Sequence, residues 1–391
     1  MTRELRRAWL GTAISFFLNA VAWASIIVRM PEIKAALGAS NSVLGLLLLV
    51  SVGGALSALR PAGRWCAKYG SSPVIVVAAL GTAVFLPVAA WLPNAWVFVL
   101  GVFGTLFSTA SMDMAQNAHA VAIEHASDRK IMGRLHGVWS IGGIAGGVVG
   151  GACAALDISL VHQAFAMSAF VVIAVVSARP LFLPGSADRH AVEQHADRPR
   201  TRTRYPSAFW ILALVGLCAA LGEGAASDWG AVLLHDEWGA SKFIASLPYI
   251  AFQSMMVIGR FSSDVLSERF GRSGVLRFCG SVTAIGLTAG MLIGDVPGVL
   301  LGWLSLGLGV SVVIPMVFSA AGALALRRYS DTLVPAQAVA VISGVVYSAF
   351  LFGPPLIGFL ADAISLRWAM LFIASLGLGV VFGANIVKQV D

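Results

Sequence analysis

Residues 68–72, Lys-Tyr-Gly-Ser-Ser, recur 201 positions later as residues 269–273, Arg-Phe-Gly-Arg-Ser. The tripeptide Gly-Ala-Ser at 38–40 recurs at 239–241 with the same offset. Each pair falls at the same place in the order of apolar segments around it. Because two separate matches share one offset, the sequence predicts two copies of one structural unit that run in the same direction, as in membrane proteins built of parallel repeats.

Twelve apolar segments surround these repeats, six in each half of the chain, and each is long enough to cross about 30 Å of hydrocarbon. They cover residues 8–28, 42–60, 73–91, 96–118, 136–155 and 160–178, and then 208–234, 243–263, 275–294, 299–325, 336–361 and 367–387. The predicted fold class is an all-α membrane protein with twelve transmembrane helices in two six-helix bundles.

The composition also indicates a membrane protein. The 391 residues are 58% hydrophobic and 12% charged, which is about half the charged fraction of soluble domains. An ordinary soluble protein is therefore excluded. A disordered chain is excluded as well, because disorder requires low hydrophobicity and high charge.

One polar stretch is long enough to be a linker, and it contains the alternating Arg-Thr-Arg-Thr-Arg of residues 200–204. We therefore predict an N-terminal bundle over residues 1–178, a cytoplasmic linker over 179–207 and a C-terminal bundle over 208–391. The linker is expected to be a solvated tether that touches anionic lipid headgroups. A regulatory site is the alternative for this segment.

The net charge of +7 comes from basic residues in the short loops. If the N-terminus is inside, all but four of the 26 Lys and Arg residues lie on the inner side, the exceptions being Arg29, Lys34, Lys242 and Arg367. Cytoplasmic loops are enriched in these residues. The pattern predicts a multi-pass protein of a bacterial inner membrane with both termini cytoplasmic, and it disfavours nucleic acid as a partner, since no basic face of a soluble module is present.

Catalytic and metal-binding motifs are missing from the sequence. The four cysteines lie far apart with no metal-ligand spacing, and no Walker-type loop, HExxH or GxSxG is found. We therefore expect no enzyme activity, no metal and no cofactor. A membrane sensor is less favoured, because the largest loop is too short for a signalling domain. A cleaved signal peptide near residues 22–24 is the alternative for the first segment, and the eleven further segments disfavour it.

The turn after the second segment resembles the major facilitator superfamily motif Gly-x-Leu-x-Asp-Arg-x-Gly-Arg-Arg. Residues 63–72 form the first copy, with Ala67 in place of the aspartate, and the second copy begins at Gly259. The resemblance covers essentially the whole chain and implies two bundles that rock about a central site. It also implies a conformational latch, in which a charged loop pairs with a neighbouring helix end, formed by Gly70, Arg260, Asp264, Arg269 and Gly271.

Shorter stretches resemble one branch of this superfamily. Asp113 and Asn117 fit the acid-x-x-x-Asn pattern of the fucose-proton symporters, in which the acid is implicated in proton coupling. Residues 23–31 and 223–229 resemble an uncharacterised bacterial inner-membrane relative of that branch. Features of drug antiporters are altered, since the fourth segment has no arginine in its membrane part and Gly147 stands where the antiporter motif has proline.

Only three of the nineteen acidic residues, Asp113, Glu223 and Asp228, lie inside the apolar segments away from their edges. Ionisable groups in a bilayer are costly and are functional candidates by default, so all three are predicted to act in proton coupling or, for Glu223, in substrate contact. The alternative for Asp113 is a structural carboxylate that is hydrogen-bonded to Asn117 or paired with an arginine near the inner surface. The alternative for Asp228 is a solvated acid or a helix-end partner. Glu223 and Asp228 are five residues apart and are not expected to form one dyad.

Polar and aromatic residues within the segments are the candidates for binding a polar, ring-bearing solute. Gln116 and Asn117 share a helix face with Asp113 through their i,i+3 and i,i+4 spacing. The predicted substrate-binding set is Asn19, Trp23, Gln116, Asn117, His136, Trp139, Gln253 and Tyr347. Packing or interface anchoring is the alternative for the tryptophans, and a helix-end hydrogen bond is the alternative for His136. Gly142, Gly146 and Gly150 predict a smooth helix face for close packing against another helix.

These predictions combine into a proton-coupled symporter of a small polar solute, with sugar-like solutes as one candidate. Alternating access would expose Asp113 to each side of the membrane in turn. The alternative is proton-driven efflux of a metabolite or drug. The expected partners are the solute, protons and the lipid bilayer, and the chain is expected to be a monomer.

Overall fold

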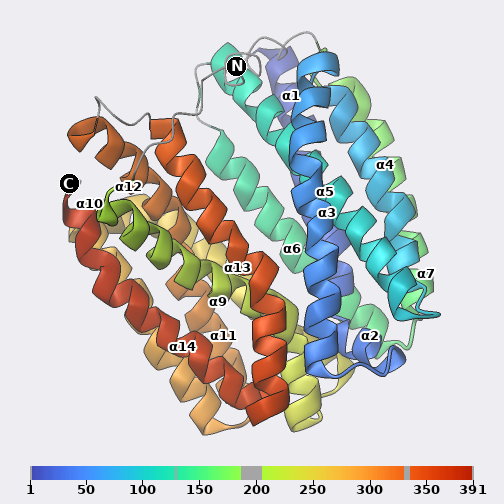
Figure 1. The fold of residues 1–391 in the computed structure, drawn as a ribbon. Helices are drawn as coiled ribbons and strands as arrows, with labels where there is room; N and C mark the ends of the chain where they lie inside the picture. Colours follow the sequence, from blue (N-terminus) through green and yellow to red (C-terminus); the bar gives the residue numbers. More distant parts are fainter. Residues whose placement is uncertain (1, 128, 130, 186–204, 330–334, 390–391) are drawn as a thin grey trace. The chain divides into compact units, whose positions relative to one another are not determined.

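The computed structural model describes residues 2–127, 129, 131–185, 205–329 and 335–389. In this part of the chain the regular structure is helical, and twelve helical segments are long and apolar enough to cross a membrane. The predicted all-α fold with twelve transmembrane helices is therefore confirmed. Figure 1 shows the helices in chain order.

The helices of the first half are α1 Arg3–Ile27, α2 Met30–Ala36, α3 Asn41–Tyr69, α4 Ser71–Ala90, α5 Ala95–Ser127, α6 Met132–Ala155 and α7 Leu160–Ala178, followed by the short 3₁₀ helix η1 Arg179–Leu181. The second half contains α9 Ser207–Trp238, α10 Lys242–Ile293, α11 Val296–Val310, α12 Val313–Arg328, α13 Pro335–Ile364, α14 Leu366–Gly383 and η2 Ala384–Gln389.

The chain divides into two compact units. Unit 1 comprises Met1–Gly38 and Leu47–Arg200, and unit 2 comprises Ala39–Leu46 and Thr201–Asp391. One boundary falls inside the predicted linker, residues 179–207, of which residues 186–204 lie outside the described part. The other boundary was not predicted, because the first turns of α3 belong with unit 2.

Unit 1 is built around α1, which packs against α5, α6 and α7, while α4 packs against α5 and α7 (Figure 1). The predicted glycine face of α6 lies directly on the backbone of α1. A Cβ atom on Gly142, Gly146 or Gly150 would come within 2.6, 2.6 and 2.3 Å of the carbonyl oxygens of Phe17, Val21 and Ser25. The close packing expected from these glycines is thus present, and only glycine fits at the contact.

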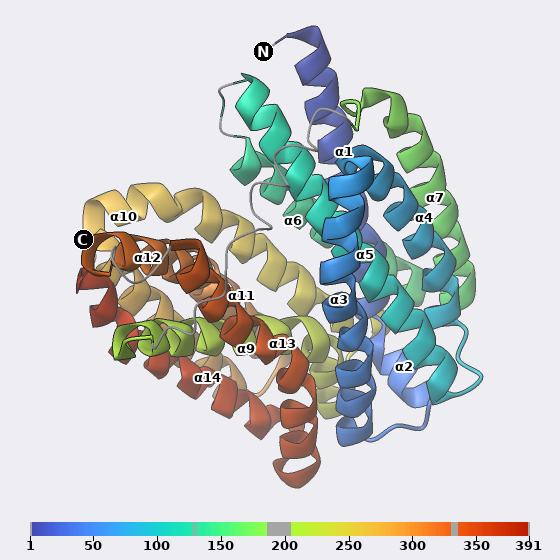
Figure 2. The same ribbon diagram turned by 45° about the horizontal axis from the view of Figure 1, so that its top comes forward.

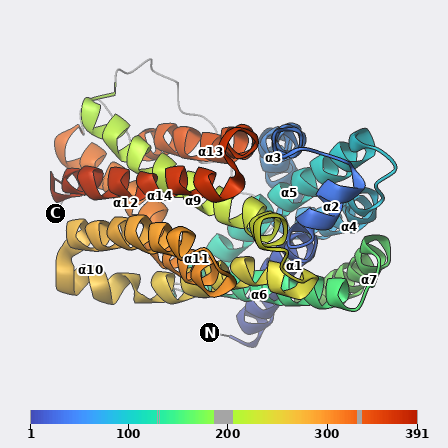
Figure 3. The same cartoon turned by 90° about the horizontal axis from the view of Figure 1, so that it is seen from below.

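In unit 2, α9 packs against α10, α11, α13 and α14 (Figure 2). Helix α10 consists of two arms that reverse direction at a break, and α11 packs against it (Figure 3). Its single non-helical residue is Gly271, with φ 69° and ψ 155°. The apolar segments predicted a loop between residues 263 and 275. This prediction was wrong, because the helix continues to Phe270 and resumes after one glycine.

A comparable break divides the predicted segment 299–325. Helix α11 ends at Val310 and α12 begins at Val313, with a turn at Ser311 and Val312 between them. The hydroxyl of Ser311 donates to the carbonyl of Leu308 at 2.7 Å, which gives the backbone an alternative hydrogen bond at the break.

The repeat seen in the sequence is also present in the backbone. Gly38 and Gly239 both have left-handed conformations, with φ 59° and 60°. Gly70 and Gly271 both separate two helices, with φ 82° and 69°. Positive φ is accessible to glycine at little cost. The two sequence matches therefore mark equivalent helix ends in the two halves.

Candidate functional site

Asp113 lies on α5 and forms a small polar cluster with the next turn of the helix. The amide of Gln116 donates to its Oδ1 at 3.2 Å, and the amide of Asn117 donates to the same oxygen at 3.1 Å. Asn117 also donates to the Asp113 carbonyl at 2.8 Å. The shared helix face predicted from the spacing is present.

No basic side chain among the described residues forms an ion pair with Asp113. Its carboxyl group is held by two neutral amides instead. Gln116 is fully buried, and in the described part of the chain its Oε1 has no hydrogen-bond partner. The cluster therefore has an acid without a counter-charge and a buried acceptor without a donor, both of which are unusual inside a protein.

Glu223 on α9 faces α10 of the same unit. The Arg260 guanidinium lies 3.8 Å from its Oε1, and the two side chains are 30% and 21% exposed, Arg260 being the more exposed. Arg260 is one of the predicted latch residues and lies in the predicted segment 243–263. The structure places it within a continuous helix, where it pairs with the acid of a neighbouring helix.

Tyr249 extends this polar face of α10. Tyr249, Gln253 and Arg260 are spaced i, i+4 and i+11, which places them along one side of the helix. The Tyr249 hydroxyl accepts from the Gln253 amide at 3.1 Å and is within electrostatic range of both Glu223 and Asp228. Tyr249 was missed in the sequence, although its i,i+4 spacing to Gln253 could have shown it. Among the described residues, Glu223 and Asp228 form no hydrogen bond with each other.

Two buried polar atoms in the same region lack partners within the described residues. Trp229 is fully buried and its Nε1 donor is unpaired, and Gln253 is 4% exposed with an unpaired Oε1 acceptor. By contrast, the nearby Trp303 donates from Nε1 to the Ala226 carbonyl at 3.2 Å. A buried unsatisfied group costs about 1–3 kcal/mol. The pair leaves one donor and one acceptor for a bound molecule or water.

Asn19 links three helices of unit 1. Its Oδ1 accepts from the Trp139 indole on α6 at 3.1 Å, and its amide donates to the Thr109 carbonyl on α5 at 2.8 Å. Each end of the Asn19 amide is thus already bonded within the bundle. Trp23, one turn further along α1, is half-buried.

His136 and Tyr347 lie in aromatic surroundings. The His136 ring packs edge-on against Phe16, with centroids 5.3 Å apart. Tyr347 on α13 contacts the rings of Phe318 and Phe350 and is 51% exposed.

The predicted latch residues have different surroundings in the structure. Gly70 and Gly271 end helices, as described above, and a Cβ atom on Gly70 would lie 2.1 Å from the Gly185 carbonyl oxygen. The Arg269 guanidinium lies 5.4 Å from the ring centroid of Phe270. The side chain of Asp264 lies outside the described residues. The latch itself stays a prediction.

Three acids at segment edges have a structural role that the sequence reading did not assign. Each accepts hydrogen bonds from the first backbone amides of another helix: Glu124 from Ile131 and Met132, Glu237 from Leu366 and Arg367, and Asp362 from Asn41 and Ser42, at 2.6–3.4 Å. Carboxylates are favourable there because the first amides of a helix lack intrahelical partners. The described residues contain no group of three metal-ligating side chains, and the cysteines are free.

Twelve membrane-length helices in a parallel repeat, with acidic side chains within two of them, define a multi-pass membrane transporter rather than a soluble fold. The family model described as Major Facilitator Superfamily matches residues 12–334. The chain therefore belongs to the major facilitator superfamily, as the sequence resemblance implied.

Its relatives cover the full length of the chain. An uncharacterised superfamily transporter of Yersinia pestis is 33% identical over 97% of this chain and 95% of its own length. The crystal structure of the nucleoside transporter NupG superposes with a TM-score of 0.74 at 14% identity, over 98% of this chain and all of that one. The Escherichia coli fucose:proton symporter FucP gives 0.61 at 18% identity, over 98% and 99%. At these identities the two structures establish a shared fold.

Proposed function

We propose that this chain is a proton-coupled symporter of a small polar solute and that Asp113 is the proton carrier. The observation that carries the proposal is the state of Asp113 in the structure, an acid on a membrane-length helix with two amide hydrogen bonds and no ion pair among the described residues. In an alternating-access cycle, such an acid can take up a proton from one side of the membrane and release it on the other.

The polar side chains of α9 and α10 in unit 2, Glu223, Asp228, Trp229, Tyr249 and Gln253, support a polar solute as the cargo. Glu223, Asp228 and Tyr249 supply oxygen atoms, while Trp229 and Gln253 supply the unpaired donor and acceptor. A solute rich in hydroxyl groups can donate to the acids and to Gln253 and accept from Trp229. Sugars, polyols and nucleosides have this chemistry, and a small polar site of this kind fixes orientation and specificity.

The proposed location is a bacterial inner membrane with both termini in the cytoplasm, because the basic residues gather on that side. A fluorescent protein fused to the C-terminus that fluoresces only in the cytoplasm tests this orientation. A fusion that stays dark at normal expression would contradict it.

The coupling is tested with purified protein in liposomes. A thermal-shift screen over sugars, polyols, nucleosides and amino acids first identifies a solute, because the stability added by a bound ligand rises with the logarithm of its concentration over its Kd. Asp113→Asn should then exchange solute across the membrane but fail to concentrate it under a proton gradient. Glu4→Gln, a surface acid on α1, is the matched control and should behave as wild type.

Two outcomes would overturn the proposal in different ways. Uphill accumulation by Asp113→Asn would exclude Asp113 as the proton carrier. Solute uptake driven by an outward-directed proton gradient, with no uptake under an inward one, would show proton-driven efflux instead of symport.

A further inference from the structure

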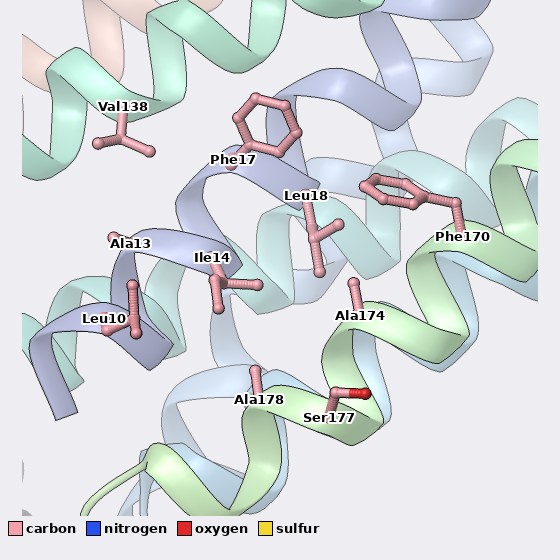
Figure 4. Close-up of a pocket in the computed structure, with 10 residues that line it drawn as sticks. All are labelled: Leu10, Ala13, Ile14, Phe17, Leu18, Val138, Phe170, Ala174, Ser177 and Ala178. Atoms are coloured by element: carbon pink, nitrogen blue, oxygen red, sulfur yellow. The ribbon is translucent and has the colours of Figure 1, made fainter. Parts of the chain in front are cut away.

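An apolar groove opens between α1, α6 and α7 of unit 1, with a volume of about 470 Å³ (Figure 4). Nine of its ten lining residues are apolar, and Ser177 is the exception. The lining residues are Leu10, Ala13, Ile14, Phe17, Leu18, Val138, Phe170, Ala174, Ser177 and Ala178. The volume is within the roughly 300–1,000 Å³ of sites that hold small molecules.

The groove is suited to an apolar guest and not to the polar solute proposed above. Leu10 and Phe170 at its edge are 48% and 46% exposed in unit 1. Its lining offers one hydroxyl and no charged group for hydrogen bonding. All three helices are long and apolar enough to cross a membrane, so an apolar guest can come from lipid.

Basic side chains extend the groove at one end. On α1, Arg3 and Arg7 precede Leu10 and Ile14 at i,i+4,i+7,i+11 spacing, so the two arginines continue the same helix stripe. The Arg7 guanidinium donates to the Pro180 carbonyl at 3.4 Å, which places the start of α1 beside the end of α7.

The charge at this end is positive. Arg179 follows the groove residue Ala178 directly, and Arg3, Arg6, Arg7 and Arg179 are all exposed. Glu4 is the one acid in the first turn of α1. An apolar groove therefore ends in four arginines and one glutamate, which is complementary to a molecule with a hydrocarbon tail and an anionic head.

We propose that this groove is a binding site for an anionic phospholipid of the surrounding membrane. One acyl chain would lie along Leu10, Ile14 and Phe170, and the phosphate would lie against Arg7 and Arg179. Basic pockets between membrane helices bind anionic headgroups in this way, and each basic residue contributes about fivefold in affinity, the equivalent of about 1 kcal/mol. The site is independent of the proposed transport cycle.

Native mass spectrometry of the full-length protein tests the proposal. The probes are phosphatidylglycerol and phosphatidylcholine with identical acyl chains, titrated into delipidated protein in detergent. Wild type should retain one phosphatidylglycerol in preference to phosphatidylcholine. Arg7→Gln together with Arg179→Gln should lower phosphatidylglycerol affinity about 25-fold, which is two steps of fivefold, while phosphatidylcholine retention stays unchanged.

A second variant tests the acyl chain. Ala174→Trp places an indole in the groove and should reduce retention of both lipids. Val77→Trp on α4, at a site 68% exposed, and Arg64→Gln on α3 are the matched controls and should bind as wild type does. If Ala174→Trp does not fold, the double arginine variant still decides the headgroup.

The proposal is overturned by equal retention of the two lipids in wild type, or by a double arginine variant that still prefers phosphatidylglycerol. Either result would show ordinary boundary lipid. Displacement of phosphatidylglycerol by a second copy of the chain, seen as dimers that carry no lipid, would also overturn it and assign the groove to self-association.

Discussion

Arg260 on α10 and Glu223 on α9 form an ion pair within unit 2, with 3.8 Å between Nη2 and Oε1. The pair joins two membrane-length helices, and its acid is one of the three that lie deep in the apolar segments. A partly buried pair of this kind ties the stability of the unit to the charge state of a candidate transport residue.

Removing one partner of this pair should lower the unfolding free energy more than removing both partners. We expect Arg260→Gln to lower the unfolding free energy by about 1–3 kcal/mol, between the values for exposed and buried pairs, because it leaves Glu223 without its counter-charge. The double variant Glu223→Gln, Arg260→Gln should recover most of that loss. Thermal unfolding in detergent measures the coupling, and strictly additive effects would show that the pair contributes nothing.

The contact between α6 and α1 should tolerate no side chain at Gly146. A Cβ atom there would lie 2.6 Å from the Val21 carbonyl oxygen, so Gly146→Val should destabilise unit 1 by about 1–3 kcal/mol or prevent its folding. Gly133→Ala on the same helix is the control, because nothing lies within 4 Å of its Cβ position. Equal melting temperatures for Gly146→Val and wild type would refute the close contact.

Asp362 should protect the start of α3. Its two carboxylate oxygens accept from the backbone amides of Asn41 and Ser42 at 3.1 and 2.9 Å. Asp362→Ala should cost about 0.5–2 kcal/mol, as for other helix caps, and should speed amide hydrogen exchange in residues 41–43. Glu237→Ala is a matched change that should speed exchange at the start of α14 and leave α3 unaffected.

Trp139→Phe separates a structural role from a substrate-binding role. The substitution removes the indole donor to Asn19, which is 3.1 Å away, and keeps an aromatic ring. We expect a loss of about 1 kcal/mol in stability with the solute KM unchanged. A raised KM at unchanged stability would support the predicted role of Trp139 in substrate binding. Asn19→Ala should give the same result as Trp139→Phe.

The fold could be predicted because the length of an apolar segment is enough to identify a membrane helix. The two glycine pairs show the repeat in both sequence and backbone. The helix ends could not be predicted in this way, since hydropathy falls where a helix leaves the hydrocarbon, while the backbone stays helical in water. For that reason α3 extends to Tyr69 and α10 to Phe270 before each turn.

For the candidate site, only relationships between residues of the same helix could be predicted. The spacing of Asp113, Gln116 and Asn117 was enough to predict their shared helix face, and the hydrogen bond between Asp113 and Asn117 was the alternative to a coupling role. The contacts between helices were not predictable, because Arg260 with Glu223 and Trp139 with Asn19 depend on how neighbouring helices are rotated. Tyr249 was not predicted as a site residue, because tyrosine is common at membrane interfaces and only the neighbouring side chains distinguish this one.

The one-residue turns at Gly70 and Gly271 leave no slack between the helices that they join. Two helices joined in this way can change their relative direction only through the φ and ψ of a single residue. The same joint at equivalent places gives the two halves matched mechanical elements. A side chain at either glycine would strain its joint, because positive φ is costly for a residue with a Cβ atom, and at Gly70 it would also meet the Gly185 carbonyl oxygen.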